Sequence, residues 1–196
     1  MGFITRKDGK QTNQLLLKAH EALCAVPHRG GMSSEGVGDG AGISIDLSLN
    51  FFSKITSRRL IKERFCVGNF FMPNDKKNED YATKIIIDTL TEKGFSLIKI
   101  RNIPVNQSVL SNVSVSSQLA IKQFIFNTPK HNKKLDKVIY NCLLKIESIA
   151  FTKENLSDFY PLSLSNKLQV LKGRLKSSEI IPYFMDLNDI EHKIHS

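Results

Sequence analysis

The sequence predicts an α+β protein, with several strands close together along the chain and helices between some of them. Three observations lead to this class. Apolar residues recur at helical spacing in residues 135–149, apolar and polar residues alternate in residues 43–49, and residues 64–72 form an almost continuous apolar run. Helices and strands do not alternate strictly along the chain, so a repeated βαβ arrangement is not expected.

The first helix is predicted to begin at Thr12 or Asn13, either of which can cap it, and to extend to about Val26. Pro27 stops it. One face carries apolar residues at helical spacing, namely Leu16, Ala19, Leu23 and Val26.

Two strands are predicted next. After a glycine-rich stretch, residues 43–49 alternate as a strand with one buried face: Ile43, Ile45, Leu47 and Leu49 are apolar, and Ser44, Asp46 and Ser48 are polar. The run RFCVGNFFM at residues 64–72 lacks this alternation and predicts a strand covered on both faces.

A second helix is predicted from Asn78, which can cap it, with Glu79 and Asp80 in a first turn that favours acidic residues. Gly94 ends this helix, and residues 95–100 predict another short strand.

The last third of the chain contains the clearest helical stripe. Residues from 116 onward fit a helix and a strand equally well. Residues 159–164 and 167–171 predict two strands that pair around residues 165–166. The helical stripe consists of Leu135, Val138, Cys142, Ile146 and Ile149.

Composition limits the classes of function. The chain has 196 residues, 41% of them apolar, but no run long enough to span a membrane and no apolar segment of a signal peptide. The net charge of +9 permits nucleic-acid binding, but the lysines are scattered, and clusters such as 57–59 and 130–134 are typical of solvated surfaces. We therefore expect no membrane segment, and we rank a basic nucleic-acid binder lowest.

The cysteines Cys24, Cys66 and Cys142 are far apart and form no CxxC pair. We expect neither a metal site nor an iron–sulfur cluster from them. An odd number of cysteines without framework spacing suits a reducing compartment, so a cytoplasmic protein is expected.

The glycine-rich stretch is PHRGGMSSEGVGDGAGI, residues 27–43, and within it residues 36–41 match GxGxx[GA] by letter. A dinucleotide loop follows a strand and opens a helix, whereas here a helix precedes and a strand follows, so the nucleotide interpretation fails. Two interpretations stay open. The glycines supply positive φ in turns, or they allow a close backbone approach at a strand start, with Arg29 and Asp39 as charged partners.

The order of several motifs resembles one family. The segments ALCAVPHRGG, GDGAGISIDL and FF, followed by FCVGNFFMPND, IRNIPVN, SLSNKLQVLKG and YFMDL, are similar to the class II glutamine amidotransferase domain of glutamate synthase large subunits. The resemblance is collinear over residues 1–196. It implies an N-terminal-nucleophile hydrolase fold, αββα with stacked antiparallel sheets, that hydrolyses glutamine to glutamate and ammonia. The family's nucleophile is an N-terminal cysteine whose own α-amine is the base.

The resemblance also implies that this domain is incomplete at both ends. The register set by Lys10, Leu23 and His28 places the family's Cys-Gly pair before Met1, and Cys24 has no free α-amine to replace it. The family's Arg-Phe-Ser-Thr segment and its Asn-Gly oxyanion pair come after the matched residues. We therefore expect a partial domain that is inactive alone and assign no catalytic residue, no metal and no cofactor.

The alternative is a non-catalytic or complementing subunit, whose site a second chain completes; glutamine would bind only to the completed site. The retained residues are expected in loops beside the family's active site, although a purely structural role as turns and an ion pair stays open. They are His28, Arg29, Gly30, Gly38, Asp39 and Gly40.

Overall fold

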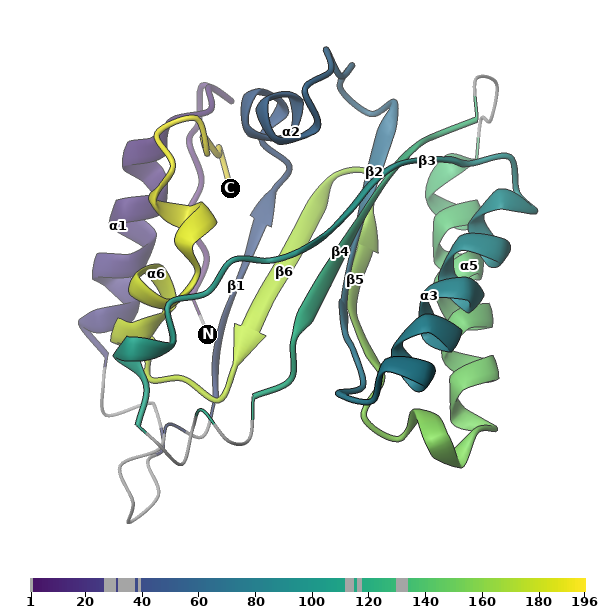
Figure 1. Ribbon diagram of the computed structural model, residues 1–196. Helices are drawn as coiled ribbons and strands as arrows, with labels where there is room; N and C mark the ends of the chain where they lie inside the picture. Colours follow the sequence, from purple (N-terminus) through teal and green to yellow (C-terminus); the bar gives the residue numbers. More distant parts are fainter. Residues whose placement is uncertain are drawn as a thin grey trace. The chain divides into compact units, whose positions relative to one another are not determined.

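The computed structural model describes residues 2–26, 31, 38, 40–111, 115, 118–129 and 134–196. It confirms the α+β class (Figure 1): within these residues the strands form a two-stranded sheet, β1-β6, and a four-stranded sheet, β3-β4-β2-β5. The chain divides into two compact units, which are described separately. The first comprises residues 1–58, 104–118 and 170–196, and the second comprises residues 59–103 and 119–169.

The first unit contains the two-stranded sheet, whose arrows point in opposite directions in Figure 1. Strand β6 begins in the second unit and continues into the first from Val170. The elements are α1 (Asn13–Cys24), β1 (Ala41–Asp46), α2 (Leu49–Thr56), η2 (Gln107–Val109), β6 (Leu168–Gly173), η4 (Ser177–Glu179), α6 (Ile180–Tyr183) and η5 (Met185–Asn188).

Helix α1 begins as predicted. Thr12 is its N-cap, and the Thr12 side chain accepts a hydrogen bond from the Leu15 backbone N–H. The helix ends at Cys24, slightly before the predicted Val26. Leu15 and Leu16 are its buried residues. Of the predicted stripe, Leu16 is therefore buried, Ala19 and Leu23 are half-buried, and Val26 lies beyond the helix and is 41% exposed.

The strand predicted for residues 43–49 exists, but it begins two residues earlier, at Ala41, and its predicted end is wrong. Strand β1 stops at Asp46, and helix α2 begins at Leu49. The alternation of ISIDLSL runs across this boundary, but the residues after it favour a helix: the Ser48 carbonyl accepts the Phe52 N–H, and both Phe51 and Phe52 are buried. Helical packing of two adjacent aromatic side chains therefore overrides the period-two pattern.

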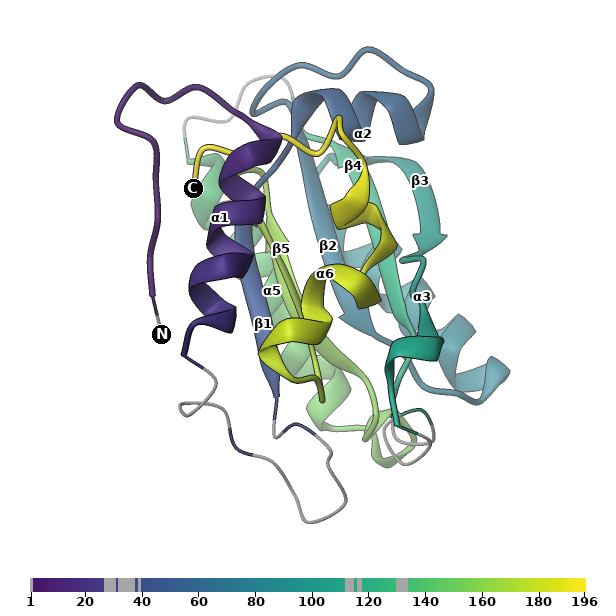
Figure 2. The same cartoon turned by 90° about the vertical axis from the view of Figure 1, so that its left-hand side faces the viewer.

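The last residues of the chain lie beside α1 and the N-terminal segment (Figure 2). Thr12 and Ile194 form an antiparallel bridge, and the Arg6 N–H donates to the His195 carbonyl. The Asp46 N–H donates to the Ser196 carbonyl at the end of β1. Residues 194–196 are thus held by hydrogen bonds to both the N-terminal segment and β1.

The second unit contains the four-stranded antiparallel sheet, with β2 between β4 and β5. The prediction that residues 64–72 form a strand covered on both faces is confirmed, because β2 is buried along almost its whole length. The elements are β2 (Phe65–Phe71), α3 (Lys76–Thr91), β3 (Ser96–Asn102), β4 (Ile121–Asn127), α5 (Leu135–Phe151), η3 (Glu154–Leu156) and β5 (Tyr160–Ser165).

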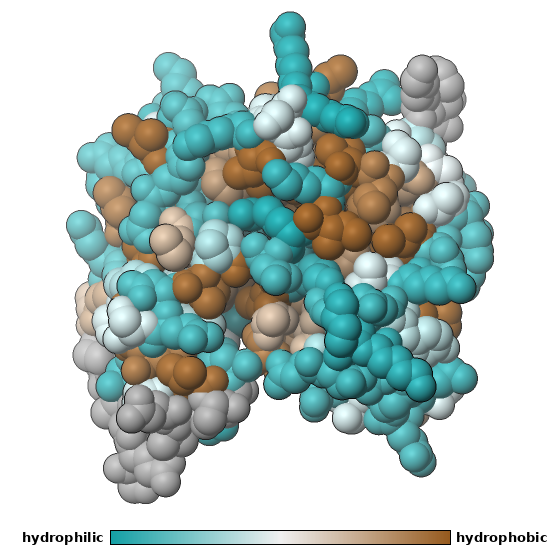
Figure 3. Space-filling view, in the orientation of Figure 1, coloured by the Kyte–Doolittle hydropathy of each residue, from teal (hydrophilic) through white to brown (hydrophobic). Residues whose placement is uncertain are grey.

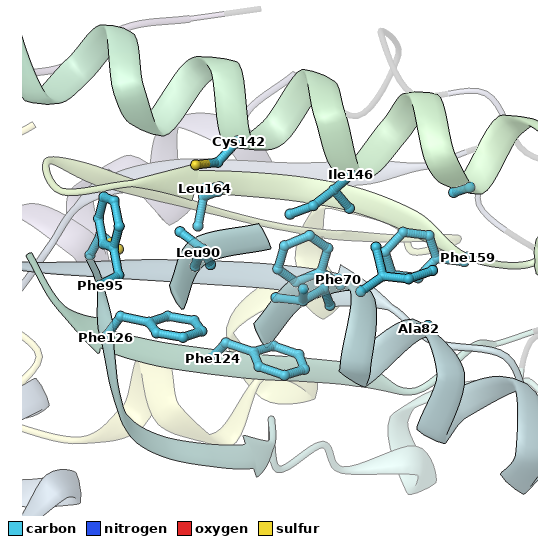
Figure 4. Packing of buried hydrophobic residues seen from close by; sticks show 14 of the residues in the cluster. Phe70, Ala82, Leu90, Phe95, Phe124, Phe126, Cys142, Ile146, Phe159 and Leu164 are labelled. Atoms are coloured by element: carbon cyan, nitrogen blue, oxygen red, sulfur yellow. The ribbon is translucent and has the colours of Figure 1, made fainter. Parts of the chain in front are cut away.

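The core of this unit lies between the sheet and the helices α3 and α5. Figure 4 shows Cys142 and Ile146 of α5 pointing toward a group of aromatic rings on the strands. Phe70 of β2 packs edge-on against Phe124 of β4 at 5.6 Å between ring centroids. The helix predicted from the stripe at residues 135–149 is confirmed by α5. Of the stripe, Cys142 and Ile146 are buried, the other three residues are partly buried against the core, and α5 also buries Ile139 and Ala150.

Two boundaries in the second unit differ from expectation. Helix α3 is capped by Asp75, whose carboxylate accepts the Asn78 N–H, so the predicted cap Asn78 lies inside the first turn. The later start was predicted because Glu79 and Asp80 follow Asn78, and acidic residues favour the first turn of a helix. The open region after residue 116 contains strand β4 from Ile121; residues 116 and 117 themselves lie outside the described residues.

The two strands predicted near residues 165–166 exist, but the prediction that they pair with each other is wrong. β5 pairs with β2, whereas β6 pairs with β1. The backbone N–H groups of Lys167 and Leu168 donate to the Ser165 hydroxyl, which closes a local turn without a hairpin. The stacking of the two sheets between helical layers stays a prediction.

Candidate functional site

Only part of the expected site lies among the described residues. His28, Arg29, Gly30 and Asp39 lie outside them. Gly38 and Gly40 are described, and both lie just before β1 in the first unit.

Gly38 is buried against the protein's own backbone. A Cβ atom at this position would lie 2.3 Å from the Leu175 carbonyl oxygen and 2.6 Å from the Lys176 nitrogen. Real Cβ atoms do not approach other atoms this closely, and backbone atoms cannot rotate away as a side chain can. The close backbone approach expected for this loop is therefore present, between Gly38 and the chain that follows β6.

Gly40 and Gly42, which follow Gly38, are required for two other structural reasons. Gly40 has φ +146°, a conformation that side chains rarely adopt. A Cβ at Gly42 would lie 2.7 Å from the Lys172 Cβ, because β1 and β6 approach closely at this point. Among the described glycines, Gly40 has a positive φ and Gly38 makes a close backbone contact. The expected charged partners, Arg29 and Asp39, lie outside the described residues, so that part of the second interpretation stays a prediction.

The loop leads into a strand, as predicted. β1 begins at Ala41, and no helix begins between residues 40 and 46. The structure therefore supports the exclusion of a dinucleotide loop, which needs a helix N-terminus for the pyrophosphate.

The turn against which Gly38 packs is itself ordered by hydrogen bonds. The Leu175 N–H donates to the Gly173 carbonyl at 2.9 Å, and the Lys176 N–H donates to Glu179 Oε2 at 2.7 Å. Leu175 is 1% exposed, so its side chain anchors this turn in the first unit. The rigid partner of Gly38 is thus a turn between β6 and η4.

Sequence reasoning missed one polar pair, His20 and Cys24 on α1. The His20 Nε2 and Cys24 Sγ atoms are 3.5 Å apart, and both side chains are half-buried. The spacing i, i+4 on a predicted helix is the signal that could have found it.

Metal and small-molecule sites have little support in the described residues. Within them, no group of three or more His, Cys, Asp or Glu side chains is placed to hold a metal ion.

A hollow of about 250 Å³ lies between the N-terminal segment and α1, lined in part by Arg6, Thr12 and Lys18. Arg6 there is paired with Asp8, and this hydrogen bond lowers the pKa of Asp8 to about 2.

The fold and the loop together define a class of protein: a mixed α+β protein with two antiparallel sheets, whose glycine-rich loop leads into a strand and is not a nucleotide loop. The class II glutamine amidotransferase family matches residues 1–195. The chain belongs to this family, as the resemblance in its motifs predicted.

The similar proteins are glutamate synthases. The chain is 31% identical over 210 residues to glutamate synthase [NADH] of Saccharomyces cerevisiae, with 100% of the chain and 10% of that protein aligned. It is 29% identical to the glutamate synthase [NADPH] large chains of Azospirillum brasilense and Bacillus subtilis, with 96% of the chain and 13% of each relative aligned. The chain thus spans roughly a tenth of the length of these relatives.

Proposed function

We propose that residues 1–196 form part of a type-2 glutamine amidotransferase domain of the N-terminal-nucleophile hydrolase class, which releases ammonia from glutamine. The observation that carries the proposal is the family match along residues 1–195. The contact of Gly38 with the turn at Leu175, shortly before β1, supports it.

The proposal assigns the loops at residues 28–30 and 38–40 to the neighbourhood of the reacting amide. Two described residues of these loops support the assignment: Gly38 is in close contact with the turn at Leu175, and Gly40 has φ +146° directly before β1. Catalysis depends on groups that are already in position, and a backbone contact of this kind holds a segment in place.

We further propose that these 196 residues do not hydrolyse glutamine by themselves. Attack on the amide carbonyl needs a thiol with a nearby base, and residues 1 and 2 are Met and Gly, which have no thiol. Cys24 is the last residue of α1, and its α-nitrogen is part of a peptide bond. On this proposal, the attacking thiol comes from outside these 196 residues.

A chimeric enzyme tests the proposed function. In the large chain of Bacillus subtilis glutamate synthase, residues 3–195 of this chain would replace the aligned segment. The N-terminal residues of the chimera would remain those of the Bacillus subtilis protein. We expect this chimera to release ammonia from glutamine, because the relative supplies the groups that the 196 residues lack.

The matched variants are Arg29→Ala, in the proposed site loop, and Arg58→Ala, in the same unit directly after α2. We expect Arg29→Ala to lose most of the ammonia release and Arg58→Ala to retain it. A chimera that is folded by circular dichroism and gel filtration but releases no ammonia would show that these residues do not carry the proposed site.

A further inference from the structure

Helix α1 brings a thiol and an imidazole together one turn apart. The Cys24 Sγ and His20 Nε2 atoms are 3.5 Å apart, which is within hydrogen-bonding distance for sulfur. Residues at i and i+4 lie on the same face of a helix, so the backbone of α1 itself holds the two groups together. A nucleophile and a base in this relation form the basic arrangement of an activated thiol.

The other two thiols are in a different environment. Cys66 is 0% exposed on β2 and Cys142 is 2% exposed on α5, and burial raises the pKa of both thiols. A thiol with a raised pKa inside a packed core is unreactive. Cys24 is half-buried instead, and it is the cysteine that solvent reaches.

We propose that His20 and Cys24 form a thiol-modification site that reacts with low-molecular-weight aliphatic disulfides. His20 Nε2 takes the proton of the Cys24 thiol, and the resulting Sγ attacks one sulfur of the disulfide. The S–S bond of the reagent breaks as the Sγ–S bond forms, and the departing thiolate takes the proton from His20. Cys24 is oxidised to a mixed disulfide, and the leaving sulfur is reduced to a thiol.

The site is independent of glutamine hydrolysis, because neither residue belongs to the loops of the proposed amidotransferase site. Its position gives the modification a structural consequence. Cys24 is the last residue of α1, and Ala25 forms the C-cap with its N–H on the Glu21 carbonyl. A mixed disulfide at Cys24 adds a bulky group to the last turn of α1, just before the glycine-rich stretch in the sequence.

The test begins with the number of reactive thiols in the folded chain. The reagent is an aromatic disulfide that releases a coloured thiolate. In the native protein one thiol per chain should react quickly with it, and in the unfolded chain three thiols should react. Cys24→Ser should lose the fast equivalent. Glutathione disulfide should then add one glutathione by mass spectrometry, mapped to the peptide that contains Cys24.

The role of His20 is tested with His20→Ala and the matched control Glu21→Ala, an exposed neighbour on the same helix. We expect His20→Ala to slow the Cys24 reaction roughly tenfold, less than the ~10²–10⁴ typical of evolved general bases, and Glu21→Ala to leave it unchanged. Free imidazole in the buffer should restore part of the rate in His20→Ala, which a purely structural role for His20 would not allow. A Cys24 that reacts no faster than the buried thiols, or a His20→Ala rate equal to that of the native chain, would overturn the proposal.

Discussion

A methyl group at Gly38 would collide with backbone, and this makes Gly38 the most constrained glycine in the described part of the loop. We expect Gly38→Ala to lower the free energy of unfolding by about 1–3 kcal/mol, the usual range for overpacking. The Leu175 carbonyl oxygen, 2.3 Å from the added Cβ, can yield only by displacing the turn. Urea unfolding measures this effect.

The matched control for Gly38 is Gly2→Ala, because nothing lies within 4 Å of a Cβ at Gly2. We expect this control to unfold like the native chain. Equal stability of the Gly38 variant and the control would contradict the packing described for the loop.

In the first unit, Asp46 accepts hydrogen bonds with both of its carboxylate oxygens. Its Oδ1 accepts the His195 and Ser196 N–H groups at 2.7 and 3.0 Å, and its Oδ2 accepts His195 Nδ1 at 2.9 Å and the Gln11 amide. An asparagine has one acceptor oxygen in place of two, so Asp46→Asn leaves partly buried donors unpaired. We expect a loss of about 1–3 kcal/mol in unfolding free energy.

Amide hydrogen exchange distinguishes this local effect from general destabilisation. Exchange at Ile194, His195 and Ser196 should accelerate more in Asp46→Asn than exchange in β2. Asp88→Asn, on the exposed face of α3, is the control and should change neither. Uniform acceleration throughout the chain would argue against a specific role for Asp46 in holding residues 194–196.

At the scale of elements, an ion pair links α3 to the sheet. Glu79 in the first turn of α3 pairs with Lys122 of β4 and with Lys76. The hydrogen bond from Lys122 lowers the pKa of Glu79 below its ordinary value of 4.5, and the bond from Lys76 adds to this effect. Because the folded-state pKa is lowered, the pair stabilises the fold above the unfolded-state pKa, and this contribution is lost as pH falls through the folded-state pKa.

We therefore expect Glu79→Gln to cost up to about 1 kcal/mol at neutral pH, within the range for partly exposed pairs. The difference from the native chain should shrink as pH falls below 4.5. Urea unfolding at a series of pH values measures it, with Glu147→Gln on the exposed face of α5 as control. A difference that is independent of pH would show that the charge of Glu79 is not its cause.

Elements with strong local signals were predictable from the sequence. The Thr12 cap, the stripe of α5 and the apolar run of β2 each depend on neighbouring residues, and the structure contains all three. Strand pairing depends on residues far apart in the chain and was therefore missed. The Gln169 side chain of β6 accepts hydrogen bonds from Asn69 of β2 and Gln123 of β4, and no local pattern around residues 165–166 indicates these partners.

The candidate site was likewise predictable only where its signals are local in the sequence. Spacing and flanking elements showed that the glycine-rich stretch is not a nucleotide loop, because both features are local. The partner of Gly38 was not predictable, since Leu175 is more than a hundred residues away. The role of His28, Arg29, Gly30, Gly38, Asp39 and Gly40 beside the reaction centre stays a prediction.

For the whole molecule, the net charge of +9 comes from 28 Lys and Arg residues against 19 Asp and Glu residues. Several lysines form ion pairs: Lys54 with Asp189, Lys145 with Glu92 and Lys167 with Asp136. Hydrophilic residues cover much of the face in Figure 3, with hydrophobic patches between them. No helix of the described residues has the length and apolarity needed to cross a membrane.

These residues belong to the class II glutamine amidotransferase family, and we predict that they do not hydrolyse glutamine by themselves. The most direct test is ammonia release from glutamine by the isolated 196-residue chain carrying Cys24→Ser, with and without a thiol-alkylating reagent. The substitution removes the accessible thiol, so any effect of alkylation would have to arise elsewhere. We predict no release above background in either sample, whereas steady, alkylation-sensitive release of ammonia would contradict the account.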